Sequence, residues 1–491
     1  MSLVDRTEPN INNKPIIWNA LDAAAATGGR SRGGIWEATG VSIDTRSLKY
    51  GDLFIALRGT RQDGHDFIEK AFSKGASAAL VDKLPSQTMS SSPILVVEDT
   101  MLALYALAKV ARKRTRAKII AVTGSVGKTG TKEMLAAALS NYGLVSSSIG
   151  NENNQIGVPL NLSRLPENCD FGVFEAGMNA PGEIGKLSEI IQPDVGLITT
   201  IESAHTEFFK SIEDIAIAKG ELFNGLNKSG TALINRDNQF HSILYELSKK
   251  AGISEIKTFG KNNESDLQLI SSITNEHGTD IVAKIEGSHH KYSIMLHGAH
   301  WAINSLAALG AATSIGLPLR GLLRGLSSLE PIKGRGQVLT ISCNNGYIKV
   351  IDDSYNANPA SVRAALHNLG DKTCEKKGRR VAFLGDMLEL GINSNQEHAA
   401  LASICHDSGI DFVCTVGPFM FHLHSALPLG IRGNHYSTVD QLCDCIEEII
   451  KPSDTILVKG SQGARMGQII NTLMSKHIKQ TNGVGGKTNA L

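Results

Sequence analysis

The chain has 491 residues, with 49 lysines and arginines against 48 aspartates and glutamates and a formal net charge of +1. At about 150 residues per domain, this length predicts about three domains. The balanced charge and the lack of any apolar run near the roughly 18 residues of a membrane span lead us to expect a cytoplasmic protein that binds no nucleic acid and inserts into no membrane.

The first stretch of the chain alternates short apolar runs with helical periodicity. The runs at 52–57, 76–81 and 94–97 predict strands, and the stretches 66–73 and 101–114 have the spacing of helices. This pattern predicts a small α/β domain.

The segment 118–132 is the most informative part of the sequence, because a short apolar strand runs into a glycine-rich turn. Gly124 and Gly127 let backbone N–H groups converge on an anion. Lys128 supplies a positive charge, and Thr129 offers a hydroxyl to Mg²⁺. Two residues separate the glycines instead of the usual four, which points away from ordinary GTPases; a chance glycine turn is the alternative. We predict an ATP phosphate site made of Gly124, Ser125, Val126, Gly127, Lys128 and Thr129.

Strands alternate with helix-length stretches after this motif. We expect strands at 118–122, 171–175, 195–200 and 231–234. Such alternation predicts a parallel, doubly wound sheet that binds ligands at the carboxyl ends of its strands. Between residues 267 and 296 apolar and polar residues alternate, which indicates an antiparallel appendage.

Two helical stretches, 299–315 and 318–329, lead to a further domain. Residues 331–336 predict a hinge, because glycines flank a charged residue between periodic segments. Beyond the hinge we expect strands at 347–351, 380–384, 412–416 and 455–458, alternating with helices. The tail from Gln480 is rich in glycine, asparagine and threonine and is expected to be disordered.

Chemically useful side chains follow two strands of the central sheet. Glu175 ends one strand and precedes a flexible turn, so metal binding is one role for its carboxylate. His205 follows a second strand in the same topological position, which would bring it near the phosphates. Taken singly, both residues also fit solvated loops, and Lys219, within an apolar helical pattern, fits a surface lysine.

Three polar islands, at 298–304, 352–359 and 384–390, are too specific for packing alone. The second and third face a ligand crevice if the last sheet is parallel. An Asx-rich turn and a helix cap are the structural alternatives.

Taken in order, these motifs resemble the signature of the Mur ligases, the ATP-dependent enzymes that build the stem peptide of peptidoglycan. The resemblance covers residues 38–475 and rests on 123–129, 175–177, His205, Ala218-Lys219, 235–237, His300 with Asn304, and Gly334-Arg335. The segments 42–46, 64–67, 150–159, 355–359 and 384–387 resemble the branch that adds D-alanyl-D-alanine. The Asp-Asn-Pro-Arg signature of the diaminopimelate-adding branch is absent. Two positions depart from the pattern: Gly130, where relatives often have threonine, and Gln462, where a basic residue is common.

The resemblance implies a three-domain α/β architecture. It would comprise an N-terminal UDP-substrate-binding domain at 1–115, a central P-loop parallel-sheet ATPase domain at 116–330 and a C-terminal Rossmann-like domain at 331–491. ATP would phosphorylate the terminal carboxylate of UDP-MurNAc-tripeptide, and the amine of D-alanyl-D-alanine would then displace phosphate. These small molecules are the expected partners, and a monomer is the expected state.

The resemblance also implies a role for each candidate residue. Lys128, His205 and Lys219 would be catalytic. Thr129, Glu175, His205 and Lys219 would hold two Mg²⁺ ions, with Lys219 carbamoylated. Asn304, Arg335 and Asp353 would contact the adenine, a phosphate and the ribose of ATP. Ser42, Asp44, Thr45 and Arg46 would recognise UDP, and Asn151, Asn153 and Asn154 would lie near the muramoyl-peptide. Tyr355, Asn356, Asn358 and Asp386 are the candidates for the incoming dipeptide.

Two alternative functions stay open. Another Mur-type or folylpolyglutamate-type amide ligase would share the ATP site but not the segments 355–359 and 384–387. A nucleotide-dependent switch or transport ATPase is the other alternative, against which the lack of an Asn-Lys-x-Asp guanine signature argues. Diaminopimelate and lysine both remain as the third residue of the tripeptide.

Overall fold

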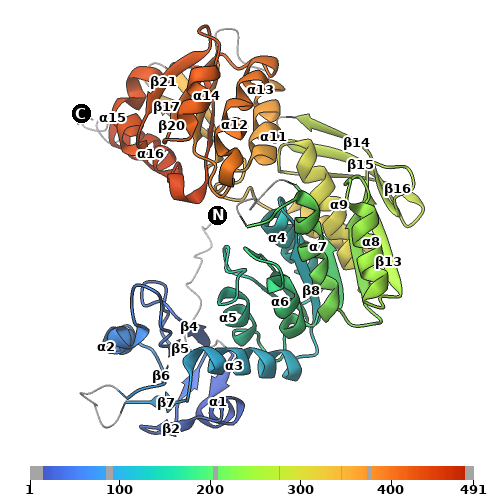
Figure 1. Cartoon of the computed structure of the whole chain (residues 1–491), viewed down its shortest axis with the longest axis vertical. Helices are drawn as coiled ribbons and strands as arrows, with labels where there is room; N and C mark the ends of the chain where they lie inside the picture. The colour runs from blue at the N-terminus through green and yellow to red at the C-terminus, as the bar shows by residue number, and fades with distance from the viewer. Residues whose placement is uncertain are drawn as a thin grey trace, which may run out of the picture.

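Three α/β units follow one another along the long axis of the molecule, from the blue N-terminal unit through the green and yellow central unit to the orange and red C-terminal unit (Figure 1). The computed structural model describes residues 15–84, 92–202, 208–275, 277–343, 346–372 and 378–481. Each unit contains its own main sheet with a hydrophobic cluster on either face, so the chain builds separate cores rather than one.

The N-terminal unit is a five-stranded sheet in the order β2-β7-β6-β5-β4, parallel except for the β2–β7 pair. Its strands are β1 (Trp18–Asn19), β2 (Arg30–Arg32), β3 (Glu37–Ala38), β4 (Gly40–Ser42), β5 (Asp52–Ile55), β6 (Ala78–Val81) and β7 (Ile94–Val96). Its helices are α1 (Ala20–Thr27), the 3₁₀ helix η2 (Gly64–Phe67), α2 (Ile68–Ser73) and α3 (Thr100–Arg114). Strands β1 and β3 form a separate antiparallel pair.

The central unit is a nine-stranded sheet in the order β16-β15-β14-β13-β12-β11-β8-β10-β9. Its strands are β8 (Lys118–Thr123), β9 (Val145–Ser147), β10 (Phe171–Glu175), β11 (Val195–Ile198), β12 (Thr231–Asn235), β13 (Glu255–Gly260), β14 (Leu267–Asn275), β15 (Gly278–Ile285) and β16 (Ser288–Ile294). Its helices are α4 (Lys128–Leu139), α5 (Gly157–Ser163), α6 (Glu183–Ile191), α7 (Ile212–Gly220), η3 (Glu221–Gly225), α8 (His241–Lys250), α9 (Ala299–Ser314) and α10 (Leu319–Ser327).

The antiparallel segment predicted as an appendage is part of this sheet, because β14 pairs in parallel with β13 before the chain turns back into β15 and β16. The remaining pairs, from β9 to β13, are parallel as predicted. The sequence pattern showed the change of direction but not the hydrogen bonds between β13 and β14, which depend on tertiary pairing.

Strand β8 is buried on both faces, which explains its continuous apolar run. Ile120 and Val122 pack against α4, α9 and α10, while Ile119 and Ala121 pack against the helices of the opposite face. The register aligns Val122 with Glu175 and Thr123 with Ile198, so the ends of the three central strands meet at one edge. The glycine turn after β8 therefore lies between the loops that follow β10 and β11.

The C-terminal unit is a six-stranded sheet in the order β17-β18-β22-β19-β20-β21, parallel except for the β17–β18 hairpin. Its strands are β17 (Gln337–Cys343), β18 (Gly346–Asp353), β19 (Arg380–Gly385), β20 (Phe412–Val416), β21 (Arg432–Tyr436) and β22 (Thr455–Lys459). Its helices are α11 (Pro359–Gly370), η4 (Gly391–Asn393), α12 (Ser394–Ala399), α13 (Leu401–Asp407), α14 (Met420–Ala426), α15 (Val439–Ile449), η5 (Gln462–Ala464) and α16 (Gly467–Thr481). Disorder was predicted from Gln480, but α16 continues to Thr481, so the predicted start is too early. The rest of the tail lies outside the described residues.

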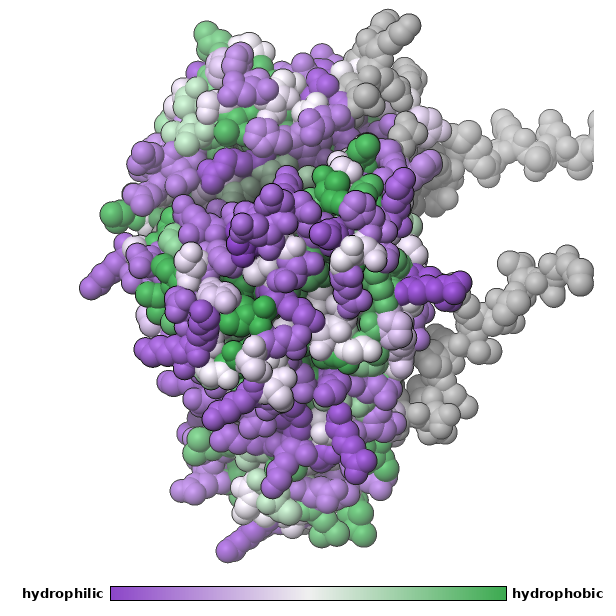
Figure 2. Space-filling model, turned by 90° about the vertical axis from the view of Figure 1, so that its right-hand side faces the viewer, coloured by the Kyte–Doolittle hydropathy of each residue, from purple (hydrophilic) through white to green (hydrophobic). Residues whose placement is uncertain are grey.

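On the face drawn in Figure 2, hydrophobic residues form scattered patches among hydrophilic ones. Within the described ranges, no helix combines the length and the apolarity needed to cross a bilayer.

Candidate functional site

The glycine turn at the start of α4 has the backbone conformation of a phosphate cradle. Gly124 has a φ of 149° and Gly127, the N-cap of α4, has a φ of 88°. A Cβ at Gly124 would overlap the hydroxyl of Thr199, and a Cβ at Gly127 would lie 2.9 Å from Oδ1 of Asn304. Both positions therefore require glycine, and the N-terminus of α4 has no side-chain cap, so its first N–H groups can serve an anion.

The loop after β11 braces the cradle from the side. The backbone N–H of Ser125 donates to the carbonyl of Thr200 at 2.8 Å, and its hydroxyl donates to the carbonyl of Glu202 at 3.0 Å. Thr199 Oγ1 donates to the carbonyl of Val126 at 2.6 Å. These bonds fix the turn before any ligand binds, which is the preorganisation that electrostatic catalysis requires.

The Lys128 side chain folds back onto its own loop. Its Nζ donates to the carbonyl of Gly124 at 2.7 Å. Burial lowers the pKa of Lys128; Glu175 opposes this shift, whereas Arg335 adds to it. A phosphate in the cradle would offer this ammonium a charged acceptor in place of the carbonyl.

Thr129 and Glu175 form a buried pair beside the cradle. Thr129 Oγ1 donates to Glu175 Oε2 at 2.8 Å, and Asn153 Nδ2 donates to Glu175 Oε1 at 2.7 Å. A hydroxyl and a carboxylate oxygen at this separation are the hard donors that Mg²⁺ prefers, so the pair fits the predicted metal site. In the described part of the chain, no three His, Cys, Asp or Glu side chains gather as a metal cluster.

Lys132 supports this pair and was not singled out from the sequence. It is fully buried, and its Nζ donates to the carbonyl of Ser148 at 2.6 Å, while the Ser148 hydroxyl accepts the N–H of Glu175 at 3.1 Å. The signal was its position four residues after Lys128, which places both lysines on the same face of α4.

Lys219 is buried in α7, with 1% of its surface exposed, so the structure does not make it the surface lysine of the alternative reading. Burial lowers the pKa of Lys219 well below its usual range; the charge of Lys128 lowers it further and Glu175 opposes the shift. The two charges that act on Lys219 belong to residues at the cradle, so Lys219 lies within electrostatic range of the cradle. His205 lies outside the described residues.

Helix α9 brings Asn304 and Trp301 against α4. Asn304 lies beside Gly127 of the cradle, and its contact with the adenine stays a prediction. Trp301, 6% exposed, occupies the space next to Gly130, where a Cβ would overlap its ring. The Gly130 departure therefore has a packing partner, which the sequence motif did not reveal.

The C-terminal unit contributes Arg335 and Asp353. The Arg335 guanidinium lies over the Tyr355 ring, 4.2 Å from the ring centre. Asp353 Oδ2 pairs with Nζ of Lys459 at 2.7 Å, and Lys459 also donates to the carbonyl of Asn356 at 2.9 Å. Burial raises the pKa of Asp353 and Lys459 opposes that shift.

The dipeptide candidates have unequal surroundings. Asn358 caps α11, where its side chain accepts the N–H of Ser361 at 2.8 Å. Asp386 is 5% exposed and accepts the N–H of Met420 at the start of α14 at 2.8 Å. The side chains of Asn358 and Asp386 therefore stabilise the starts of two helices. Tyr355 is half-buried and Asn356 is exposed, so both remain accessible to a ligand.

The UDP candidates form a compact local network at the end of β4. The Ser42 hydroxyl donates to the carbonyl of Asp44 at 3.1 Å, and the Arg46 guanidinium donates to both Asp44 oxygens. The Arg46 hydrogen bond lowers the pKa of Asp44. Thr45 is buried, and its carbonyl accepts Nζ of Lys74 at 2.7 Å.

The three asparagines of the loop before α5 point to different partners. Asn153 bonds Glu175, as described above, and Asn154 Oδ1 accepts the N–H groups of Ile156 and Gly157 at the start of α5. Asn151 Nδ2 donates to Oε1 of Gln462 at 3.3 Å, so the second departure from the sequence pattern links the central and C-terminal units.

Comparisons with known proteins agree with these motifs. Three family models match: "Mur ligase family, catalytic domain" at residues 37–123, "Mur ligase middle domain" at 122–312, and "Mur ligase, glutamate ligase domain" at 334–462. The UDP-N-acetylmuramoyl-tripeptide--D-alanyl-D-alanine ligase of Rickettsia prowazekii is 34% identical, covering 93% of this chain and 99% of the relative.

Solved structures have the same fold. MurF from Acinetobacter baumannii matches with a TM-score of 0.81 and 29% identity, covering 93% of this chain and 99% of that chain. The MurF ligase of Thermotoga maritima, solved in complex with ADP, matches with a TM-score of 0.74 and 25% identity, covering 90% of this chain and 98% of that chain.

Proposed function

This chain belongs to the Mur ligase family, and we propose that it joins D-alanyl-D-alanine to UDP-N-acetylmuramoyl-tripeptide with consumption of ATP. The observation that carries the proposal is the likeness to ligases of this activity over nearly the whole chain, including the C-terminal unit. The product would be the UDP-linked pentapeptide used in peptidoglycan synthesis. We further propose a cytoplasmic monomer with domains at 1–115, 116–330 and 331–491.

The chemistry needs a better leaving group than a carboxylate provides. ATP would phosphorylate the terminal carboxylate of the tripeptide, and the amine of D-alanyl-D-alanine would attack the acyl phosphate. A C–N bond forms, the acyl C–O bond breaks, and phosphate leaves while the amine loses a proton. The first step brings two anions together, so positive charge at the cradle is essential.

The residues of the cradle fit this task. Gly124 to Thr129 would bind the phosphates of ATP through the N-terminus of α4, and Lys128 would move from the Gly124 carbonyl to the transferred phosphoryl group. Asn304 would contact the adenine, and Arg335 and Asp353 would reach a phosphate and the ribose from the C-terminal unit.

Thr129 and Glu175 would hold one Mg²⁺, and His205 with a carbamoylated Lys219 would hold a second. Mg²⁺ bound there would neutralise the repulsion between the phosphates and the acceptor carboxylate. The low pKa of Lys219 supports the carbamate, because only the neutral amine reacts with CO₂.

The donor test is product analysis. Purified enzyme, ATP and Mg²⁺ are combined with UDP-MurNAc-tripeptides ending in diaminopimelate or in lysine, and each is offered D-alanyl-D-alanine, D-glutamate, diaminopimelate or lysine. We expect stoichiometric ADP and a new amide chiefly with D-alanyl-D-alanine. Preference for a single amino acid would contradict D-alanyl-D-alanine as the donor. In a parallel reaction with a folate as the acceptor, ligation of glutamate would favour a folylpolyglutamate-type activity.

A further inference from the structure

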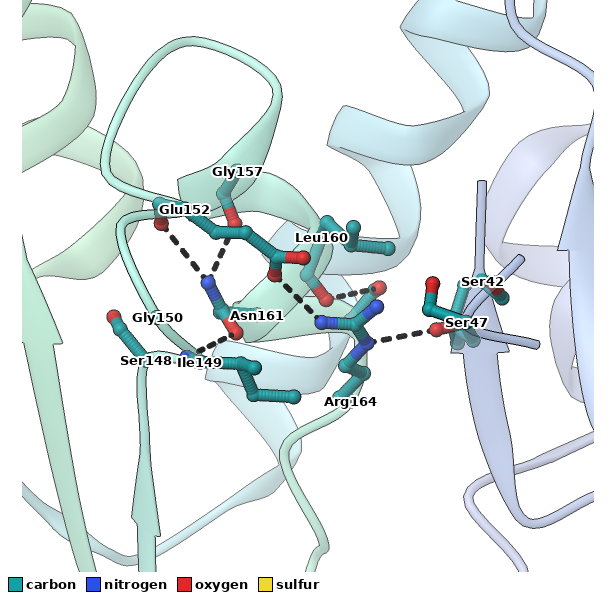
Figure 3. Close-up of polar contacts among 12 residues, drawn as sticks. Ser42, Ser47, Ser148, Ile149, Gly150, Glu152, Gly157, Leu160, Asn161 and Arg164 are labelled. Atoms are coloured by element: carbon teal, nitrogen blue, oxygen red, sulfur yellow. Dashed lines mark hydrogen bonds and ion pairs between the residues drawn. The ribbon is translucent and has the colours of Figure 1, made fainter. Parts of the chain in front are cut away.

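A polar cluster joins strand β4 of the N-terminal unit to the loop before α5 in the central unit (Figure 3). At its centre, Arg164 Nε donates to the carbonyl of Val41 at 2.7 Å, and Nη1 donates to Oε2 of Glu152 at 2.7 Å. The Arg164 side chain is 19% exposed. Because the guanidinium presents its donors in a rigid plane, the two bonds together fix Glu152 relative to β4.

Asn161 holds the same loop from the inside. It is 3% exposed, and its Nδ2 donates to the carbonyls of Glu152 at 3.0 Å and Gly157 at 2.9 Å. Its Oδ1 accepts the N–H of Ile149 at 3.1 Å (Figure 3). The loop 149–157 is thus tied at its beginning, middle and end, so a displacement of Glu152 would be transmitted along it.

Each end of this cluster borders a group of candidate substrate residues. Val41 directly precedes Ser42 in β4, at the start of the UDP candidates. On the other side, Asn153 follows Glu152 and bonds Glu175, which accepts the hydroxyl of Thr129 in the cradle. Arg164 therefore lies between the segment expected to bind the nucleotide end of the acceptor and the loop expected to bind its peptide end.

Apolar packing at the same place keeps the two units together. Leu160 of α5 is fully buried in the core cluster of the N-terminal unit, and Ile156 packs against that cluster. The interface thus has a hydrophobic base, to which Arg164 adds directional bonds.

We propose that Arg164 is a positioning residue for the UDP-N-acetylmuramoyl-peptide, holding the Ser42 segment and the loop 149–157 at the separation that one acceptor molecule spans. The assignment of the acceptor rests on the proposed function. An acceptor that meets both subsites in place loses less freedom on binding than one that must order them, so the bonds of Arg164 contribute to its affinity. ATP would use the cradle and the C-terminal unit, whereas the side-chain bonds of Arg164 go to Val41 and Glu152, so the effect on ATP should be the smaller one.

Arg112 provides a matched control. It lies in α3, and its Nε and Nη2 donate to the carbonyls of Ile191 and Gln192, both at 2.8 Å. It therefore also ties a helix of the N-terminal unit to the central unit. Its partners lie at the C-terminal end of α6, whereas the loop 149–157 meets the opposite end of that helix through a bond from Gln155 to Glu183.

The kinetic test compares R164A, R164K and R112A with the wild type. For R164A we expect a rise of about tenfold in KM for UDP-MurNAc-tripeptide, with KM for ATP and for the donor changed less than about twofold. R164K should lie between, since one ammonium cannot reproduce the planar fork. R112A should keep all three KM values. A uniform rise in KM, or equal effects of R112A and R164A, would overturn the positioning role.

Hydrogen–deuterium exchange reads the same role without ligation. In the ligand-free proteins, the backbone amides of 149–157 should exchange faster in R164A than in the wild type, and R112A should not change them. Unchanged exchange in R164A would overturn the positioning role of Arg164 even if the enzyme ligates as proposed. Faster exchange of 149–157 in R164A alone, in a protein that joins no D-alanyl-D-alanine, would support the positioning of the loop by Arg164 and refute the proposed function. If R164A does not fold, the milder R164K carries both measurements.

Discussion

Lys219 is a buried lysine whose surroundings disfavour its positive charge. Within a buried helix face, its ammonium loses hydration and feels the charge of Lys128, and both effects lower the pKa of Lys219. A larger fraction of Lys219 is therefore the neutral amine at neutral pH, where CO₂ and bicarbonate are both present. The neutral amine is the form that reacts with CO₂, so the lowered pKa favours carbamate formation. Modification would replace a disfavoured buried cation by an anion with two oxygen donors of the kind that Mg²⁺ prefers.

Removal of this side chain should stop turnover but spare nucleotide binding. We expect K219A to lose activity by about 10² to 10³, as for the loss of one electrostatic contact to a transferring group, while ATP still binds the cradle. Wild-type activity should fall when the enzyme is depleted of CO₂ at mildly acidic pH and return with bicarbonate. The measurement is ¹³C NMR with labelled bicarbonate, with exposed Lys228→Ala as the control. Full activity of K219A without a carbamate signal would contradict the role.

His398 is a second residue whose environment fixes its protonation. It is fully buried, its Nδ1 lies 2.6 Å from the carbonyl of Ser394, and its Nε2 accepts the N–H of Met387 at 3.0 Å. Only the neutral ring with a proton on Nδ1 satisfies both contacts. Burial lowers the pKa of His398, and Ser394 and Asp386 oppose the shift.

The sign of the pH effect follows from that direction. Because the folded-state pKa is below the unfolded value of about 6.5, the unfolded chain binds the proton first on acidification. The contribution of His398 is thus full above about pH 6.5 and lost as the pH falls toward the folded pKa. We expect H398L to be less stable than the wild type by about 1–3 kcal/mol at pH 7.5. The gap should narrow toward pH 5 in urea titrations; a widening gap would contradict the neutral tautomer.

At the scale of elements, α9 supports the start of α4. Asn304 lies against Gly127, and Trp301, one turn earlier, fills the space beside Gly130. Trp301 Nε1 also lies 3.8 Å from the position of a Cβ at Gly336. The ring therefore packs between the cradle helix and the link to the C-terminal unit.

A double-mutant cycle measures this contact. Gly130→Ala should destabilise the protein by about 1–3 kcal/mol, because its Cβ would overlap the Trp301 ring. In a Trp301→Leu background the same change should cost less, with a coupling energy of about 0.5–3 kcal/mol from urea unfolding. Additive losses would show that the two residues do not share this space.

Local signals explain what could be predicted at this scale. The strand, glycine turn and helix of 118–132 were predictable because their chemistry lies in consecutive residues, and Glu175 was predictable from its strand end. The three-residue strand β9 and the β13–β14 pairing were missed, since only tertiary hydrogen bonds define them. The sequence did not reveal the roles of Arg164, Lys132 and Trp301. Each of these side chains contacts a residue that is distant in the sequence, so no local pattern marks the contact.

At the scale of the molecule, the link at 331–336 is fastened to the C-terminal unit. The N–H of Gly334 donates to Oδ2 of Asp352 at 3.1 Å, and the Gly334 carbonyl accepts the N–H of Tyr355 at 3.0 Å. The N–H of Gly336 donates to the carbonyl of Asp352 at 2.8 Å. These bonds attach Gly334 and Gly336, with Arg335 between them, to the C-terminal unit, so we expect the pivot of the predicted hinge to lie before Gly334.

Starting from an open ligand-free form, binding of ATP and the acceptor should draw the C-terminal unit toward the central unit, because Arg335 and Asp353 must meet the nucleotide held by the cradle. Small-angle scattering should show a smaller radius of gyration with UDP-MurNAc-tripeptide and a non-hydrolysable ATP analogue together than with either alone. Gly334→Ala should weaken this compaction, because its φ is 75° and a Cβ would lie 3.1 Å from Cβ of Tyr355.

Gly252→Ala is the control for that substitution, because Gly252 has a φ of 80° with nothing within 4 Å of a Cβ. Backbone strain should cost both variants about 1 kcal/mol of stability, since both place an L side chain at positive φ. Only the change at Gly334 also disturbs the anchor beside Arg335, so only it should reduce compaction and turnover. An unchanged radius in the wild type with both ligands bound, or equal losses in the two variants, would refute closure through this link.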